Sequence, residues 1–248
     1  MFNNAFNKRT IHLYIIIWIL ILLIIISGFT MVRYFVKGED KIPFQISKMF
    51  TVSTAKTKNL NLEDKKYTAD IMQINDIYIS IEKNQKYKKD DLIKEISLEN
   101  FRIIEGGRKG DFEIYKENKK NDKFIYTEEN KQNQIVYKGV HILDLENDDL
   151  EIANQGGIIK LSIIFNNLGN IEYSVNDNVN RDGTLLNGLG LSYDDIKAKI
   201  SFDLKIKLES GNNFYTNIIL DLPVGNILQN GISSEEYSNI QNLVFKRF

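Results

Sequence analysis

An unbroken apolar segment near the start of the chain limits the possible folds more than any other feature. Residues Ile15–Ile26 include eleven Ile and Leu side chains and no charged one. Those eleven side chains favour insertion into a bilayer by about 3 to 7 kcal/mol. The stretch between Tyr14 and Tyr34 would rise about 30 Å as a helix, which matches the hydrocarbon core and puts a tyrosine near each interface. The sequence therefore predicts one transmembrane helix.

This segment is interpreted as an uncleaved signal anchor. The residues that follow it, Ser27–Val32, interleave bulky side chains with small ones and lack the alternating small residues of a cleavage site. Basic residues flank the helix on both sides, so the positive-inside rule hardly separates the two orientations. A short tail before a single helix, with a large domain after it, is the usual layout of a protein whose C-terminus lies outside. We expect a cytoplasmic tail over residues 1–9, an anchor over 10–36 and an extracytoplasmic domain over 37–248.

Beyond the anchor, the hydropathy pattern has a period of two, which is typical of β-strands. The clearest alternating run is Lys199–Glu209, and a second one, Phe214–Leu222, follows the turn signal Ser210–Asn213. The two runs predict an antiparallel hairpin with one buried and one charged face. On the charged face, a substitution such as Lys205→Asp is expected to change stability by no more than about half a kcal/mol. The buried face is predicted to carry Ile200, Phe202, Leu204, Ile206, Leu208, Phe214, Thr216, Ile218, Leu220 and Leu222.

Further strand candidates recur at short spacing, with no long amphipathic helix between them. This organisation predicts a mainly β domain, an antiparallel sandwich or jelly roll with a few short helices. A turn is expected at Gly169-Asn170, between separate strands at 157–165 and 171–175. The polar stretch 116–134 is a solvated β-excursion or, in a second interpretation, a boundary between two subdomains. Short helices are expected at Thr184–Leu189, Ser192–Ile196, Asp90–Lys94 and Ser233–Ile240.

Composition excludes several classes of site. The 32 basic and 33 acidic residues balance to a net charge of −1, so no nucleic-acid partner is expected. The chain has no cysteine, which excludes disulfides, thiolate metal sites and a cysteine nucleophile. Only two histidines occur, and His12 lies at the membrane edge. His141 lies in a strand pattern over 135–143 and is interpreted as an ordinary strand residue. The motifs of zinc proteases, phosphate-binding loops and serine hydrolases are also missing.

One local pattern suggests a metal ion. Asn178, Asn180 and Asp182 put oxygen-bearing side chains at alternate positions before Gly183, as in the first half of a calcium loop. Such a loop ends with a bidentate glutamate at its twelfth position, which here is Leu189. We therefore expect an Asx-rich turn, with weak calcium binding by these three residues as the alternative.

Four short motifs give the chain a resemblance to a known group. It resembles uncharacterised, N-terminally anchored single-pass membrane proteins of low-GC Gram-positive bacteria of clostridial type. The resemblance implies a location in the cell envelope and carries no activity or site residue with it. The motifs are Lys41-Ile42-Pro43-Phe44, Asn75-Asp76-Ile77-Tyr78, Ile206-Lys207-Leu208-Glu209-Ser210 and Leu222-Pro223-Val224-Gly225.

Three functions remain open at this point. The first is a non-catalytic, membrane-tethered β-sandwich that binds envelope proteins or acts in envelope assembly. The second is a jelly roll that binds cell-wall polysaccharide, for which an exposed row of aromatic side chains would be the sign. The third is a glycosidase, which requires two facing carboxylates in a cleft.

Overall fold

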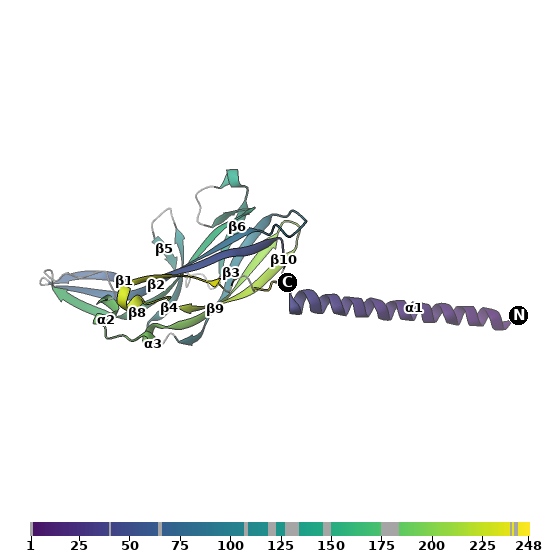
Figure 1. Cartoon of the computed structure of the whole chain (residues 1–248), viewed down its shortest axis with the longest axis horizontal. Helices are drawn as coiled ribbons and strands as arrows, with labels where there is room; N and C mark the ends of the chain where they lie inside the picture. The colour runs from purple at the N-terminus through teal and green to yellow at the C-terminus, as the bar shows by residue number, and fades with distance from the viewer. Residues whose placement is uncertain are drawn as a thin grey trace.

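The chain consists of an apolar N-terminal helix and a mainly β domain made of two six-stranded sheets (Figure 1). The structure is a computed structural model. It describes residues 2–39, 41–63, 66–106, 109–118, 123–126, 134–145, 150–174, 184–238, 240 and 243–248.

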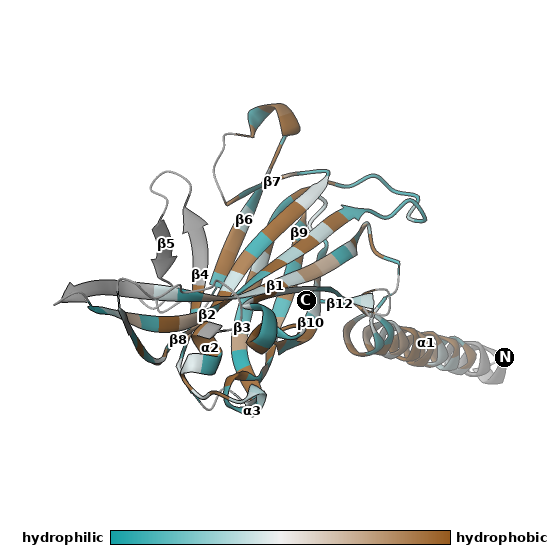
Figure 2. Ribbon diagram, turned by 60° about the vertical axis from the view of Figure 1, so that its left-hand side comes forward, coloured by the Kyte–Doolittle hydropathy of each residue, from teal (hydrophilic) through white to brown (hydrophobic). Residues whose placement is uncertain are grey.

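The apolar helix stands apart from the domain. Helix α1 (Phe2–Met31) continues into a π-helical turn, η1 (Val32–Lys37). The most apolar 18-residue window of the segment Thr10–Lys37 has a mean hydropathy of 3.0, and none of that window is buried against the rest of the chain. Figure 2 shows the apolar part of this helix in brown. By length and composition it can cross a bilayer.

The strands form two sheets, and all their recorded pairings are antiparallel except that of β6 with β7. The first sheet has the order β11 (Ile232–Glu236), β1 (Phe44–Glu63), β2 (Lys66–Lys83), β8 (Gly156–Ser174), β4 (Asp111–Asn118) and β5 (Lys123–Tyr126). The second has the order β12 (Lys246–Arg247), β10 (Asn213–Leu222), β9 (Ala198–Leu208), β3 (Ile93–Gly106), β6 (Gln134–Val140) and β7 (Glu151–Ala153). The predicted mainly β class is confirmed.

The predicted hairpin is confirmed in pairing and in its faces. Strands β9 and β10 pair from Lys207↔Asn213 to Ala198↔Leu222. All ten side chains assigned to the buried face are buried, and together with the inner faces of β1, β2, β3 and β8 they form one apolar core. The alternation that sets each face is visible as brown and teal bands along the strands of Figure 2. Burial of this face against the opposite sheet supplies the main driving force for folding.

Tyr137 joins the two sheets at their edges. Its hydroxyl, from β6, donates to the carbonyl of Lys160 in β8 and accepts from the Lys160 N–H at 3.2 Å. The described pairing of β4 with β8 runs from Ser162 to Asn166, and Lys160 lies just before it. The tyrosine thus satisfies two backbone groups of β8 near the core.

Several sequence-based expectations were wrong about local structure. The expected turn at Gly169-Asn170 is an irregularity inside one continuous strand, β8, where Asn167 and Gly169 adopt positive φ angles of 57° and 150°. The helix expected at Ser233–Ile240 begins instead as edge strand β11, paired to β1. No helix forms at Asp90–Lys94, because β3 begins at Ile93. Helices α2 (Thr184–Gly188) and α3 (Tyr193–Ile196) form within one residue of the expected ranges, and the structure adds α4 (Ile227–Asn230).

The expected excursion at 116–134 is described only in part. Its described residues belong to β4 and β5, which pair with each other and extend the first sheet, and at Gln134 to the start of β6. Whether a subdomain boundary lies here stays a prediction.

The helix meets the domain without a linker. The Gly38 N–H donates to the Arg33 carbonyl at 2.9 Å, and Glu39 pairs through its backbone with Phe245 near the C-terminus. Gly38 has a φ of 83°, and a Cβ there would come within 2.6 Å of the Phe245 carbonyl oxygen. A side chain at this position would therefore be strained and would clash. The first and last segments of the domain meet where α1 leaves it (Figure 1).

Arg247 strengthens this junction. Its Nε and Nη2 donate to the two carboxylate oxygens of Glu39 at 2.6 and 3.3 Å. Its guanidinium also lies 4.3 Å from the ring centre of Tyr34 and 5.6 Å from that of Phe214. We call the contacts of Arg247 with Glu39, Tyr34 and Phe214 the junction clamp. A bidentate ion pair held between aromatic rings is a geometry that arginine provides and lysine does not.

Candidate functional site

The calcium candidates Asn178, Asn180 and Asp182 all lie outside the described residues, so the weak site stays a prediction. Within the described ranges, no group of three or more His, Asp or Glu side chains is arranged to hold a metal ion.

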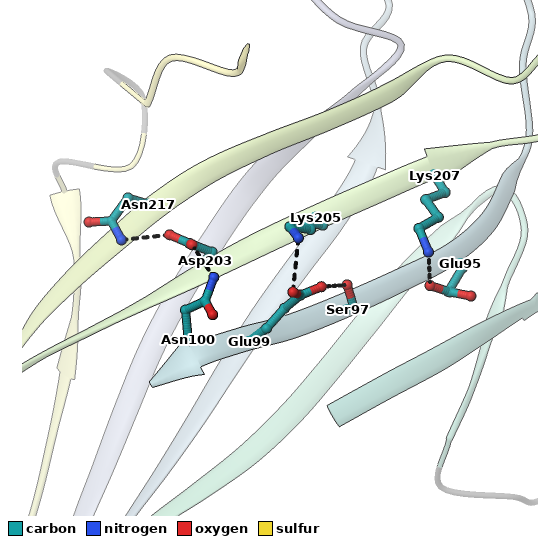
Figure 3. Close-up of polar contacts among 8 residues, drawn as sticks. All are labelled: Glu95, Ser97, Glu99, Asn100, Asp203, Lys205, Lys207 and Asn217. Atoms are coloured by element: carbon teal, nitrogen blue, oxygen red, sulfur yellow. Dashed lines mark hydrogen bonds and ion pairs between the residues drawn. The ribbon is translucent and has the colours of Figure 1, made fainter. Parts of the chain in front are cut away.

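The most extensive side-chain network lies on the outer face of the second sheet, across β3, β9 and β10 (Figure 3). Period-two alternation turns most of these side chains away from the core. Asn100 directly follows Glu99 and lies at a register shift in β3, where its φ is 57°. Strand β3 lies beside β9, so residues about a hundred positions apart in sequence become cross-strand neighbours. We call this set the polar face; its members are Glu95, Ser97, Glu99, Asn100, Asp203, Lys205, Lys207 and Asn217.

Every carboxylate of the polar face is held by a donor. Lys207 Nζ lies 2.7 Å from Glu95, and Lys205 Nζ lies 2.8 Å from Glu99. The Asp203 carboxylate accepts from Asn100 and Asn217, each at 2.8 Å. These contacts fix the orientations of charged groups that would otherwise move freely in water.

The electrostatics of Glu99 show what this face can do chemically. Partial burial alone would raise its pKa, but hydrogen bonds from Lys205 and Ser97 and the charges of Lys205 and Lys207 outweigh burial and lower it from the ordinary value of 4.5. A general acid in glycoside hydrolysis needs the opposite, a raised pKa. The polar face is thus suited to recognise polar or charged groups and poorly suited to proton transfer.

A pH-dependence follows from the lowered pKa. The unfolded chain binds a proton at Glu99 before the folded chain does, so this group adds stability above the ordinary glutamate pKa of 4.5 and loses it as pH falls through the folded value. We expect Glu99→Gln to reduce the loss of thermal stability between about pH 5 and about pH 2. Lys205→Gln should reduce it too, and the double variant should add little. If the melting temperatures of the wild type and all three variants fell equally with pH, the lowered pKa of Glu99 would be contradicted.

A surface hollow of about 320 Å³ lies at the end of the second sheet beside α3. Lys199, in its wall, lies 3.9 Å from Glu105 and 3.7 Å from Asp221. The carboxylate side chains of Glu105 and Asp221 are 71% and 78% exposed. The two carboxylates of a glycosidase must leave the space between them for sugar and water. Here the Lys199 ammonium lies close to both, so the hollow gives the glycosidase hypothesis no support.

The outer face of the first sheet carries a pair of stacked aromatic rings. Phe50 and Tyr78 stack face to face, with ring centres 4.6 Å apart and an interplanar angle of 8°. Lys48 lies 5.9 Å from the Phe50 ring centre, and Lys160 lies 5.5 Å from that of Tyr78. A sugar-binding platform needs ring faces open to solvent. Since each ring faces the other and also has a lysine nearby, this pair does not favour the polysaccharide hypothesis.

His141 caps a helical turn and is not a strand residue as expected. Strand β6 ends at Val140, and the exposed His141 Nδ1 accepts from the Leu143 N–H at 3.3 Å at the start of the 3₁₀-helix η3 (Ile142–Asp144). This turn presents apolar side chains to solvent: Ile142 is 61% exposed, Leu143 86% and Leu145 40%. We call these three residues the apolar tip. Exposed apolar clusters of this kind mark interaction sites.

A buried polar cluster lies on the inner face of the first sheet, where apolar residues are the rule. Ser53 donates to Asn75 at 2.6 Å and accepts from the Val224 N–H at 2.9 Å. Thr51 Oγ1 and Tyr237 Oη are buried, and Thr51 is the side chain that interacts with the Tyr237 hydroxyl. Burial is the main cause that raises the pKa of Tyr237 to about 12. The alternate positions Thr51 and Ser53 of β1 are the sequence signal for this cluster.

No protein-family model, no curated protein and no solved structure matches this chain.

Proposed function

We propose that this protein is a membrane-tethered, non-catalytic β-sandwich of the cell envelope that binds another protein through its exterior domain. The exposed apolar helix supports the tether, because exposure of so long an apolar surface to water is unfavourable. Balanced net charge makes a nucleic-acid partner improbable on physical grounds.

The junction clamp joins a retained anchor tightly to the domain. A signal peptide is removed and contributes nothing to the mature fold. Here Tyr34 and Glu39, at the end of the apolar helix and just beyond it, contact Arg247 at the opposite end of the chain. Cleavage before Tyr34 would leave the clamp intact, so the argument for retention is the missing cleavage pattern over Ser27–Val32. An uncleaved anchor places the domain directly on the bilayer.

The observation that carries the binding function is the apolar tip. Leu143 exposes most of its side chain, and η3 is held in shape by the His141 cap and by an Asp144 N–H bond to the His141 carbonyl at 2.8 Å. Asp144 adds a negative charge beside the apolar side chains. The matching partner surface is an apolar groove with basic residues at its rim.

A photo-crosslinking residue at Leu143 in intact cells tests this proposal. We expect one discrete protein adduct, and expect Ile142→Ser/Leu145→Ser to remove it. The same crosslinker at exposed Lys109 is the control. Adducts of the same pattern from both positions, or none from Leu143, would contradict binding at the tip.

Orientation is tested separately. With the tail of residues 1–9 inside, protease added to protoplasts should digest residues 37–248 without permeabilisation. Digestion that requires a permeabilised membrane would place the domain in the cytoplasm and contradict the proposed topology.

A further inference from the structure

The turn between β2 and β3, residues 84–92, carries exposed positive charge. Lys86, Lys88 and Lys89 are exposed, and none of them forms an ion pair with another described residue. Of the two acids in the turn, Asp90 lies 3.4 Å from Lys83, which is not one of the three lysines. Asp91 accepts from the Ser210 hydroxyl at 2.5 Å and keeps its negative charge, which offsets part of the lysine charge. The three lysines therefore present their charge to whatever lies beyond the turn.

This turn lies at the end of the domain from which the apolar helix leaves. The Asn84 N–H donates to the carbonyl of Pro43, just before β1 begins. Tyr87 lies close enough to Arg247 to add to the rise in its pKa, which is caused first by the hydrogen bonds to Glu39. In Figure 1, β10, the C-terminus and the end of the apolar helix meet at this same end.

The junction clamp holds the turn at a fixed position relative to the helix. Backbone pairing of Glu39 with Phe245 and the bidentate contact of Arg247 join the residues just beyond the helix end to the C-terminal segment. Arg33, Lys37 and Lys41 are also exposed around the helix end. When α1 spans a bilayer, these groups and the turn share the layer where lipid headgroups lie.

We infer that Lys86, Lys88 and Lys89 form a contact site for the phosphate headgroups of anionic lipids. The inference rests on the proposed insertion of α1. Lysine suits this role because its ammonium is a compact charge on a long stem, which reaches headgroups without ordering the backbone. Polybasic segments beside a transmembrane helix are attracted to anionic lipid surfaces over about a Debye length. Glu209, exposed in the neighbouring β9–β10 turn, offsets one of the three charges.

The first test uses the full chain in lipid nanodiscs. One set contains phosphatidylcholine alone, and the other contains equal parts of phosphatidylcholine and phosphatidylglycerol. Amine acetylation of each lysine is followed by mass spectrometry. We expect phosphatidylglycerol to slow acetylation of Lys86, Lys88 and Lys89 by about five-fold and to leave distal Lys56 and Lys66 unchanged, with high salt reversing the effect.

Two controls make the outcome decisive. Inorganic phosphate added to the phosphatidylcholine discs should not slow the reaction, which separates a lipid surface from free phosphate. Failure of the chain to enter nanodiscs would contradict the anchor itself. Entry with equal acetylation rates in both lipid mixtures would overturn the lipid contact and leave the anchor standing.

Substitution gives an independent measurement. When the full chain is extracted with its surrounding lipids from membranes that contain both lipids, the wild type should be enriched in phosphatidylglycerol. Lys86→Gln/Lys88→Gln/Lys89→Gln should abolish that enrichment. A matched variant that removes the same charge at Lys56, Lys66 and Lys109 should retain it. Equal enrichment in both variants would overturn the proposal.

Discussion

Ile218→Asp should prevent the domain from folding, whereas Ile219→Asp should be tolerated. These neighbours are both isoleucines in the middle of β10 and lie on opposite faces of the sheet, with exposed fractions of 1% and 55%. An aspartate at position 218 would lie unpaired in the apolar core and cost at least about 4 kcal/mol. A loss of that size approaches the whole stability of a typical domain.

Comparing Ile218→Asp with Ile219→Asp separates the effect of burial on stability from the effects of strand propensity and added charge. Ile219→Asp introduces the same side chain into the same strand and should change stability by no more than about 1 kcal/mol. Near-UV circular dichroism and protease resistance of the full chain in detergent would measure both variants. Similar losses at the two positions would mean that the faces of β10 are wrongly assigned.

Arg247→Ala should loosen the attachment of the domain to its helix. The substitution removes two charge-assisted hydrogen bonds and two cation–π contacts, and leaves the Glu39 carboxylate partly buried without its partner. The expected cost is about 3 kcal/mol, or a fall in melting temperature of about 6 to 12 °C. Limited proteolysis should show new cleavage after Lys37 or Lys41.

Arg247→Lys and Lys246→Ala serve as comparisons. Lysine keeps the charge but loses the bidentate geometry and the planar contact with Tyr34, so it should rescue the alanine variant only in part. Lys246→Ala removes a neighbouring basic residue outside the junction clamp and should leave the junction resistant to limited proteolysis. Full rescue by lysine would mean that charge alone secures the junction.

The sequence was most informative where one strand supplies the whole pattern. Alternation across Lys199–Glu209 and Phe214–Leu222 gave the hairpin and its buried face, because the period of a strand follows from the backbone alone. The prediction of a turn at Gly169 was wrong. The positive φ of Gly169 occurs at an irregularity inside β8, and the chain does not reverse there. At Ser233–Ile240, pairing to β1 outweighed a local helix signal, as tertiary context does for β-propensity.

The candidate site could not be predicted because its contacts join distant segments. The pattern of its own strand predicts that Lys205 is a solvated lysine. In the structure it forms an ion pair with Glu99 and lies 5.0 Å from the ring centre of Phe248. Lys205→Asp would therefore put a third carboxylate beside Glu99 and Asp203, and its cost should exceed the half kcal/mol expected from the sequence. The contact between Arg247 and Glu39 spans 208 positions and has no local signal.

The length of β1 has a mechanical consequence for a protein fixed to a membrane. A single strand of 20 residues leads from just beyond the helix to the far end of the first sheet. A strand rises about 3.3 Å per residue, close to the maximum reach of a polypeptide. A force applied between the bilayer and the β1–β2 hairpin therefore meets a chain that is already almost fully extended. If α1 spans a bilayer as proposed, the domain transmits tension at nearly constant length between the membrane and the β1–β2 hairpin.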